Sequence, residues 1–171
     1  MVDNHKHDLE ERVATRKAPY HFVDSGLSNV YLVGIRYSVC RSCGKQAANI
    51  PAVKQLMQAL ARAVVENEAP LSGSEIRFLR KRLGKKASEF AGIIGVSDEE
   101  ISRWENDKVG PSKSADRLIR VFYAMLSEDR ELKHRIDKEL ESFLTMFTGE
   151  SQETEIVATR DNEWKAEPVL A

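Results

Sequence analysis

The side chains of this chain best suited to reading a nucleic-acid base lie between positions 99 and 106. Glu99, Ser102, Arg103 and Asn106 recur at helical spacing, so they share the outer face of an expected helix whose other side is apolar. An arginine guanidinium can donate two parallel hydrogen bonds to O6 and N7 of guanine, and a glutamate can accept one from N4 of cytosine. An apolar stripe with a polar outer face is the layout that a recognition helix needs.

Basic side chains around this segment would suit phosphate oxygens. Lys86 stands at the start of an expected helix, where backbone amides also attract phosphate. The alternative for any single lysine is a solvated surface position. The residues that we expect to contact phosphate are Lys85, Lys86, Asn106, Lys108 and Lys113.

Two short helices joined by a tight turn would position these side chains. Residues 86–113 read KASEFAGIIGVSDEEISRWENDKVGPSK. Gly95 suits a left-handed turn, and Ser97 with Glu100 three residues later forms a capping box that starts the second helix. The inward-facing residues of the two helices are Phe90, Ala91, Ile94, Ile101 and Trp104. The pattern is that of a helix-turn-helix.

The segment ISRWENDK, followed by Gly110-Pro111-Ser112, resembles the Cro/repressor (XRE) class of helix-turn-helix proteins over residues 74–126. The resemblance implies a lambda-repressor-like DNA-binding domain that acts as a homodimer on double-stranded operator DNA with two-fold symmetry. Asp107 occupies a turn position where that class often has Gly, and Asp tolerates a left-handed backbone. By position in the motif, the residues that face the DNA groove are Asp98, Glu99, Ser102 and Arg103.

The N-terminal part has a resemblance of its own, to the MqsA-type antitoxin family. The segments that carry it are YHF at 20–22, SGLSNVYLVGI at 25–35, CRSCG at 40–44 and IP at 50–51. In that family a zinc-ribbon-like domain precedes an XRE-type helix-turn-helix, and the toxin binds mainly to the N-terminal part. The order of the parts matches this chain over about residues 20–126.

The expected metal site departs from that family, because this chain has one Cys-x-x-Cys pair where the family has two. Cys40 and Cys43 are candidate Zn²⁺ ligands, but two thiolates cannot close a tetrahedral structural site. Upstream histidines are His5, His7 and His21. Three alternatives stay open: a ribbon without metal, a zinc shared between two chains, and, less favoured, a redox pair.

The fold class that we predict is mainly α with a small N-terminal α+β unit. Strands are expected over 20–24 and 29–39, with a turn at Ser25-Gly26, and Pro51 opens a helix. The boundaries are a mobile N-terminus at 1–19, a degenerate zinc-ribbon-like α+β domain at 20–68, a linker at 69–73, the helix-turn-helix domain at 74–126, an amphipathic C-terminal helix at 127–148 and an acidic tail at 149–171, in which a marginal hairpin is an alternative.

Composition and charge bound the function. The net charge is −1, with +2 in residues 1–69, +3 in residues 70–126 and −6 in residues 127–171, so the middle suits phosphate and the tail suits a protein. No apolar run reaches the length of a membrane helix and the N-terminus has no signal-peptide core, so we expect a cytoplasmic protein. We expect no enzyme, because phosphate-binding glycine loops, nucleophile elbows and paired catalytic residues are absent from the sequence.

Two functions remain. The first is the antitoxin of a type II toxin–antitoxin system, which binds a toxin and represses its own operon. The second is a stand-alone XRE-family transcriptional regulator that senses a ligand or metal through its N-terminal unit. Both functions use the same DNA chemistry. They differ in whether residues 20–68 bind a toxin or sense a ligand or metal.

Overall fold

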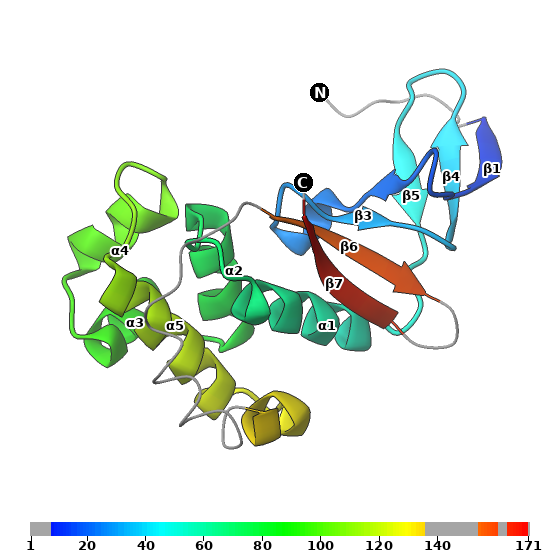
Figure 1. The fold of residues 1–171 in the computed structure, drawn as a ribbon. Helices are drawn as coiled ribbons and strands as arrows, with labels where there is room; N and C mark the ends of the chain where they lie inside the picture. The colour runs from blue at the N-terminus through cyan, green and yellow to red at the C-terminus, as the bar shows by residue number, and fades with distance from the viewer. Residues whose placement is uncertain (1–7, 136–153, 161–163, 171) are drawn as a thin grey trace.

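The computed structural model describes residues 8–135, 154–160 and 164–170, and it places a helical half beside a half that carries the sheets (Figure 1). The helices are α1 (Val53–Glu66), α2 (Gly73–Arg82), α3 (Ala87–Ile94), α4 (Asp98–Glu105) and α5 (Lys113–Leu126), and residues 130–135 are also helical. The strands are β1 (Leu9–Val13), β2 (Tyr20–His21), β3 (Tyr31–Leu32), β4 (Arg36–Cys40), β5 (Gln46–Ala48), β6 (Thr154–Arg160) and β7 (Trp164–Leu170). A mainly α fold with a small α+β unit at the N-terminus agrees with the prediction. None of the helices in the described ranges is long and apolar enough to cross a membrane.

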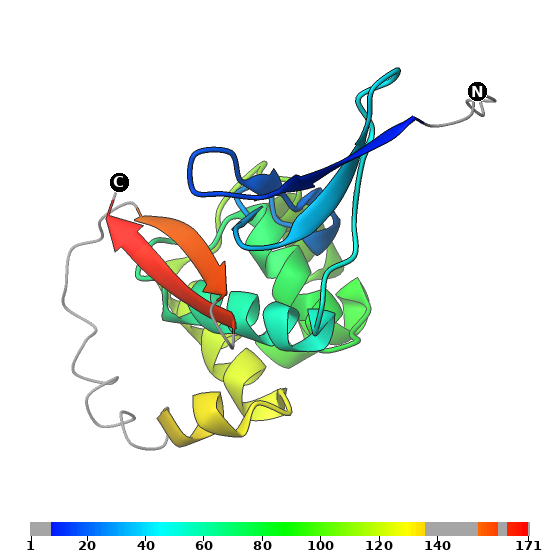
Figure 2. The ribbon, with the colours of Figure 1, turned by 90° about the vertical axis from the view of Figure 1, so that its right-hand side faces the viewer.

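The strands form two sheets. One has the order β1-β4-β5 and is antiparallel throughout, and the other has the order β2-β3-β6-β7. The second sheet joins the two ends of the chain, because β3 and β6 run parallel and pair Leu32 with Ala158. The hairpin of β6 and β7 crosses α1, as Figure 2 shows.

The C-terminal region is therefore a correction to the expected acidic tail. The hairpin alternative holds for residues 154–160 and 164–170, and pairing with β3 gives that hairpin a place in the fold. The amphipathic helix expected over 127–148 lies mostly outside the described residues. Its described beginning is helical from residue 130, and Leu132 is buried, so this part packs on the body of the protein.

The N-terminal strands also differ from the prediction. The strand expected over 29–39 is divided into β3 and β4, because Gly34 has a left-handed backbone with φ +82° and turns the chain from one sheet into the other. The segment expected to be mobile contains β1, which pairs with β4 along its whole length. The exposed sequence LEERV has little apolar pattern, so it forms a strand because it pairs with β4 and not because of its own residues.

One hydrophobic core runs through both halves. Leu56, Leu60 and Val64 on α1 are fully buried, and the same cluster extends from Ala14 near β1 to Leu132. Burial of such side chains is the main stabilising contribution to a fold of this size. The two halves are therefore packed as one body.

The segment expected to be a linker is held by a buried ion pair on α5. Arg120 is 6% exposed, and its guanidinium donates to Oδ1 of Asp116 at 2.7 Å. The other oxygen of Asp116 accepts the backbone N–H of Leu71 at 2.6 Å. Arg120 also donates to four backbone carbonyls at the end of α1 and just beyond it, those of Val64, Val65, Asn67 and Ala69. These bonds satisfy helix-end carbonyls and fix α1 against α5.

Candidate nucleic-acid interface

The turn between α3 and α4 has the geometry that the sequence predicts. Gly95 ends α3 with φ +82°, and its N–H donates to the carbonyl of Ala91 at 2.8 Å. Ser97 caps α4: its hydroxyl accepts the N–H of Glu100 at 3.2 Å, and the Glu100 carboxylate accepts the N–H of Ser97 at 3.3 Å. The capping box and the left-handed glycine are both confirmed.

The inner face of this motif is buried as expected. Phe90 and Ile101 are each 0% exposed, and Trp104 is 5% exposed. Ala91 and Ile94 on α3 are buried with them. Because the inward side of α4 is fixed by these contacts, the direction of its outward side is fixed too.

The four residues expected to read bases all lie exposed on α4. They are Asp98, Glu99, Ser102 and Arg103. Their side chains make no hydrogen bond or ion pair with any other residue that the structure describes. The first turn of α4 holds three carboxylates, which suit the positive end of a helix. The outer face of α4 is thus rigidly placed and open to a ligand.

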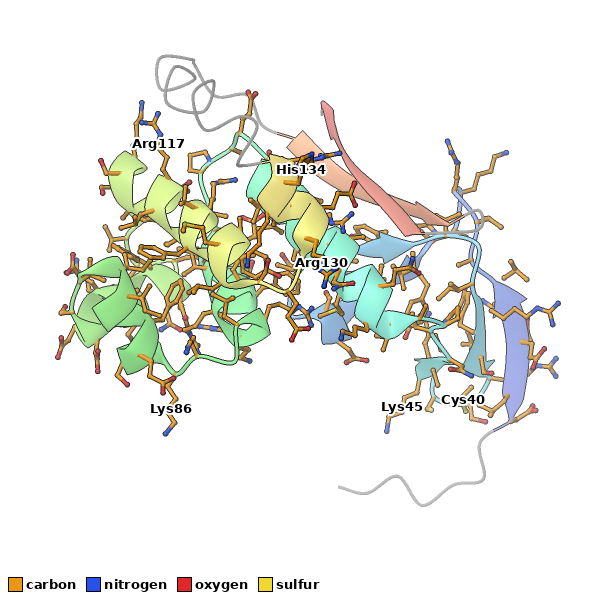
Figure 3. The ribbon with its side chains drawn as sticks, turned by 90° about the horizontal axis from the view of Figure 1, so that it is seen from below. Cys40, Lys45, Lys86, Arg117, Arg130 and His134 are labelled. Atoms are coloured by element: carbon orange, nitrogen blue, oxygen red, sulfur yellow. The ribbon has the colours of Figure 1, made fainter. Side chains whose placement is uncertain are left out.

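Most of the lysines expected to contact phosphate are exposed. Lys86, Lys108 and Lys113 are exposed, and Figure 3 shows Lys86 extending from the surface of the helical half. Lys85 is half-buried, and its carbonyl accepts a hydrogen bond from Arg80 at 2.8 Å. The N–H of Lys86 already donates to the Glu89 carboxylate at 2.8 Å, so this amide is less available to phosphate than expected.

Asn106, also expected to contact phosphate, is exposed and makes two hydrogen bonds within the protein. Its Nδ2 donates to the carbonyl of Ser102 at 2.7 Å, and its Oδ1 accepts from Arg77 at 3.2 Å. Both ends of the side-chain amide are engaged within the protein, where they cap the end of α4. The contact of Asn106 with phosphate remains a prediction.

A buried carboxylate ties α4 to α2, and the sequence reading missed it. Glu105 is 8% exposed and accepts from Arg80 at 2.5 and 2.9 Å and from Arg77 at 3.2 Å. Burial alone would raise the Glu105 pKa, but the hydrogen bonds from the two guanidinium groups outweigh it and hold that pKa below its ordinary value. The available signal was the position of Glu105, four residues after Ile101 on the buried stripe.

The end of α4 also meets the start of α2. Asp107 has a left-handed backbone, with φ +52°, as the turn position predicts, and its carboxylate accepts the N–H of Gly73 at 2.6 Å. A Cβ at Gly73 would lie 2.3 Å from the carbonyl oxygen of Trp104. This close approach requires glycine at the first residue of α2, where the start of that helix meets the end of α4.

The candidate metal ligands lie far from α4. Cys40 is buried at the end of β4, Cys43 is exposed in the turn that follows, and Figure 3 shows Cys40 and Lys86 at opposite ends of the molecule. His21 stacks on Tyr31, with ring centroids 4.8 Å apart, and its Nε2 lies 2.8 Å from the carbonyl of Ser28. Over residues 8–135, no three His, Cys, Asp or Glu side chains gather in a way that could hold a metal ion. The described donors therefore do not fit a structural zinc, and His5 and His7 lie outside the described residues.

Comparison with known proteins matches part of the helical half. Residues 76–115 match the family model HTH_3, described as helix-turn-helix. A protein of Escherichia coli (strain K12), named as the uncharacterized HTH-type transcriptional regulator YiaG, is 36% identical over 61 residues, and the YiaG proteins of Escherichia coli O6:H1 and O157:H7 match equally. The similarity covers 36% of this chain and 64% of each relative. Together with the capped α4, the glycine turn and the buried Trp104, these matches show that residues 76–115 form a helix-turn-helix domain of the XRE type.

Proposed function

We propose that this protein is a sequence-specific DNA-binding repressor of transcription that reads its operator with α4. The observation that carries the proposal is the exposed outer face of α4, which is held from behind by buried Ile101 and Trp104 and by the Glu105 ion pairs. A helix fixed in this way can enter the major groove as a rigid element. The name of the YiaG relatives, HTH-type transcriptional regulator, agrees with this proposal.

Base reading is assigned to Asp98, Glu99, Ser102 and Arg103. Arg103 donates two hydrogen bonds to a guanine, and Glu99 accepts one from a cytosine amine. The phosphates of DNA repel a carboxylate, so Glu99 selects against other bases more than it adds affinity. The three exposed lysines, Lys86, Lys108 and Lys113, supply the charge that phosphate binding needs.

The cellular role that we propose is that of an antitoxin which represses its own operon as a homodimer. The support is the N-terminal resemblance to the MqsA-type family in the segments YHF, SGLSNVYLVGI and CRSCG. In this proposal the sheet-bearing half binds a toxin, and two α4 helices read half-sites about one helical turn apart. The acidic C-terminal region has the sign of charge that attracts a basic partner.

DNA binding is tested first on duplexes from the region upstream of the protein's own gene, by fluorescence anisotropy at several salt concentrations. Tight, salt-dependent binding to one duplex is the expected result. Lys86→Ala should weaken binding evenly across sequences and flatten the salt dependence by about one counterion. Glu89→Gln, which alters a neighbouring carboxylate, serves as the control for a general change at the start of α3. Equal, weak binding to every duplex would contradict a sequence-specific repressor.

The antitoxin role is tested by expressing the neighbouring reading frame with and without this protein. Growth arrest that this protein relieves, and a stable complex of the two on purification, are the expected results. If the product of the neighbouring reading frame is not toxic while operator binding is intact, the antitoxin role is rejected. The protein would then be a stand-alone regulator.

A further inference from the structure

The strand β1 has an open edge. Among the residues that the structure describes, β4 is the only strand that pairs with it, and Figure 1 shows β1 at the outer end of the sheet-bearing half, on the far side from α4. No residue of β1 is fully buried, and Leu9 and Val13 are each 58% exposed. An edge of this kind presents unpaired backbone groups together with apolar side chains.

The hydrogen bonds at the two ends of β1 show which backbone groups point outward. The carbonyl of Asp8 accepts from Arg41 at 2.9 Å, and the N–H of Ala14 donates to Ile35 at 2.9 Å. Residues of an antiparallel strand alternate between bonding one neighbour and the other. The even-numbered residues therefore bond toward β4, and the N–H and C=O groups of the odd-numbered residues of β1 face away from it.

We propose that β1 pairs antiparallel with β1 of a second copy of this chain, in the register centred on Glu11. In that register each Leu9 lies opposite a Val13, and each Glu10 lies opposite an Arg12. Apolar and opposite-charge pairs are the cross-strand contacts that stabilise a sheet. Odd-numbered residues face one another, so every outward-pointing backbone group within the strand finds a partner.

Other registers that satisfy the backbone fit less well. A centre at Glu10 or at Arg12 keeps odd-numbered residues together and, like the centre at Glu11, places two like charges opposite each other, but it loses the pairs of Glu10 with Arg12. It also moves one apolar side chain, Leu9 or Val13, opposite the Glu11 carboxylate. Only the register centred on Glu11 pairs Leu9 with Val13 and Glu10 with Arg12, and in it the two copies join their sheets through β1.

The predicted association is weak and reversible. Five residues from each copy form a small interface, and the two Glu11 carboxylates meet at its centre, where like charges repel. Glu10 is already held by Arg12 at 3.0 Å and by Arg41 at 3.3 Å, so it stands beside the position that the second Arg12 would take. The outer face of α4 stays exposed in both copies, because it lies at the other end of the molecule.

Charge reversal tests the register directly. The mass of the full chain is followed by sedimentation velocity over a wide range of concentrations. Glu10→Arg alone and Arg12→Glu alone should each weaken self-association at least several-fold. An equimolar mixture of the two variants should associate again, because the arginine introduced in one variant then faces the glutamate introduced in the other. Lys54→Glu, an exposed reversal on α1, should associate as the wild type does.

A third change in β1 should strengthen the contact. Glu11→Thr removes the central repulsion and adds a residue that favours strands, so the association should tighten roughly two- to five-fold. Circular dichroism establishes that each variant is folded. A wild-type chain that gives no β1-dependent association at any concentration would overturn the proposal, as would an oligomer that neither reversal weakens. A dimer formed through the helical half is recognised by its insensitivity to all three β1 variants.

Discussion

At the scale of the residue, three buried charged side chains join neighbouring helices and segments. Glu105 joins α4 to two arginines of α2, and the Arg120–Asp116 pair joins α5 to the segment after α1. Each carboxylate sits among donors that satisfy it, so each charge is compensated where it is buried. Removing one partner leaves the other uncompensated, so we expect substitutions of these residues to lower stability.

Glu105→Ala is expected to lower the free energy of unfolding by about 3 kcal/mol, because it leaves Arg80 and Arg77 without their carboxylate. Urea unfolding followed by circular dichroism measures the change. Glu99→Gln, an exposed carboxylate on the same helix, should change stability by less than about 0.5 kcal/mol. Equal effects of the two substitutions would mean that the ion pairs of Glu105 contribute nothing to stability.

The same residue makes stability depend on acid pH. The Glu105 pKa is lower in the folded chain than its ordinary value of 4.5, so the unfolded chain takes up the proton first as the pH falls. The stabilisation is complete above that ordinary value and is lost as the pH falls through the folded pKa. Asp129 has a lowered pKa as well: burial raises it, and the hydrogen bonds from Arg62 outweigh burial.

Glu105→Gln should therefore flatten the loss of stability below about pH 4.5 without abolishing it, because Asp129 remains. Urea unfolding of both proteins at a series of acid pH values tests this expectation. Parallel pH curves for the variant and the wild type would rule out Glu105 as a source of the acid dependence.

At the scale of the element, the helix-turn-helix could be predicted because its signals are local. Gly95, Ser97 and Glu100 act within one turn of the chain, and the apolar spacing that buries Ile101 and Trp104 is periodic. The strands were harder to predict from the sequence, because β1, for example, has no alternating apolar residues. The pairing of Leu32 with Ala158 joins residues that are far apart in the sequence, and no local pattern encodes it.

The partners of the buried charges were missed for the same reason. Glu105 and Arg80 are separated by 25 positions, and Arg120 meets a carbonyl 56 positions away. A charged residue looks solvated in the sequence unless its partner is known. The exposure of the candidate base-reading residues could be predicted, because it follows from the register of a single helix.

The contact between α2 and the end of α4 gives a prediction with a matched control. Gly73→Ala would place a Cβ 2.3 Å from a backbone oxygen, so it should destabilise the protein by about 1–3 kcal/mol. Gly92→Ala, in the middle of α3 with nothing within 4 Å, should stabilise it by about 0.5–1 kcal/mol. The difference in melting temperature between the two variants measures the contact. Stabilisation by both would show that α2 and α4 can separate without loss.

At the scale of the whole molecule, the two halves share one core and behave as one body. The hydrophobic cluster passes from the sheet through α1 into the helical half. Arg120 holds the segment after α1 by hydrogen bonds to the carbonyls of Asn67 and Ala69. A contact of a partner with the sheet-bearing half can therefore change the stability of the DNA-binding half. Such coupling requires that the two halves unfold together.

Cooperative unfolding is tested with single-tryptophan variants. Trp104 reports on the helical half and Trp164 on β7, so replacing either one by Phe leaves a probe in one half. In each variant, the fluorescence transition in urea should coincide with the far-UV circular dichroism transition. Arg120→Met, which keeps the apolar stem and removes the hydrogen bonds, should lower stability by about 3 kcal/mol and separate the two transitions. Separate transitions before that substitution would contradict a shared core.

The central claim is that the outer face of α4 reads DNA, and a binding-site selection from a random duplex library tests it most directly. The wild-type protein should enrich one sequence with two-fold symmetry. Arg103→Ala should lose the preference for guanine at one position in each half-site and weaken binding roughly ten- to a hundred-fold. Lys81→Ala, an exposed change on α2, should select the wild-type sequence. No enrichment by the wild type, or an unchanged sequence with Arg103→Ala, would contradict the claim.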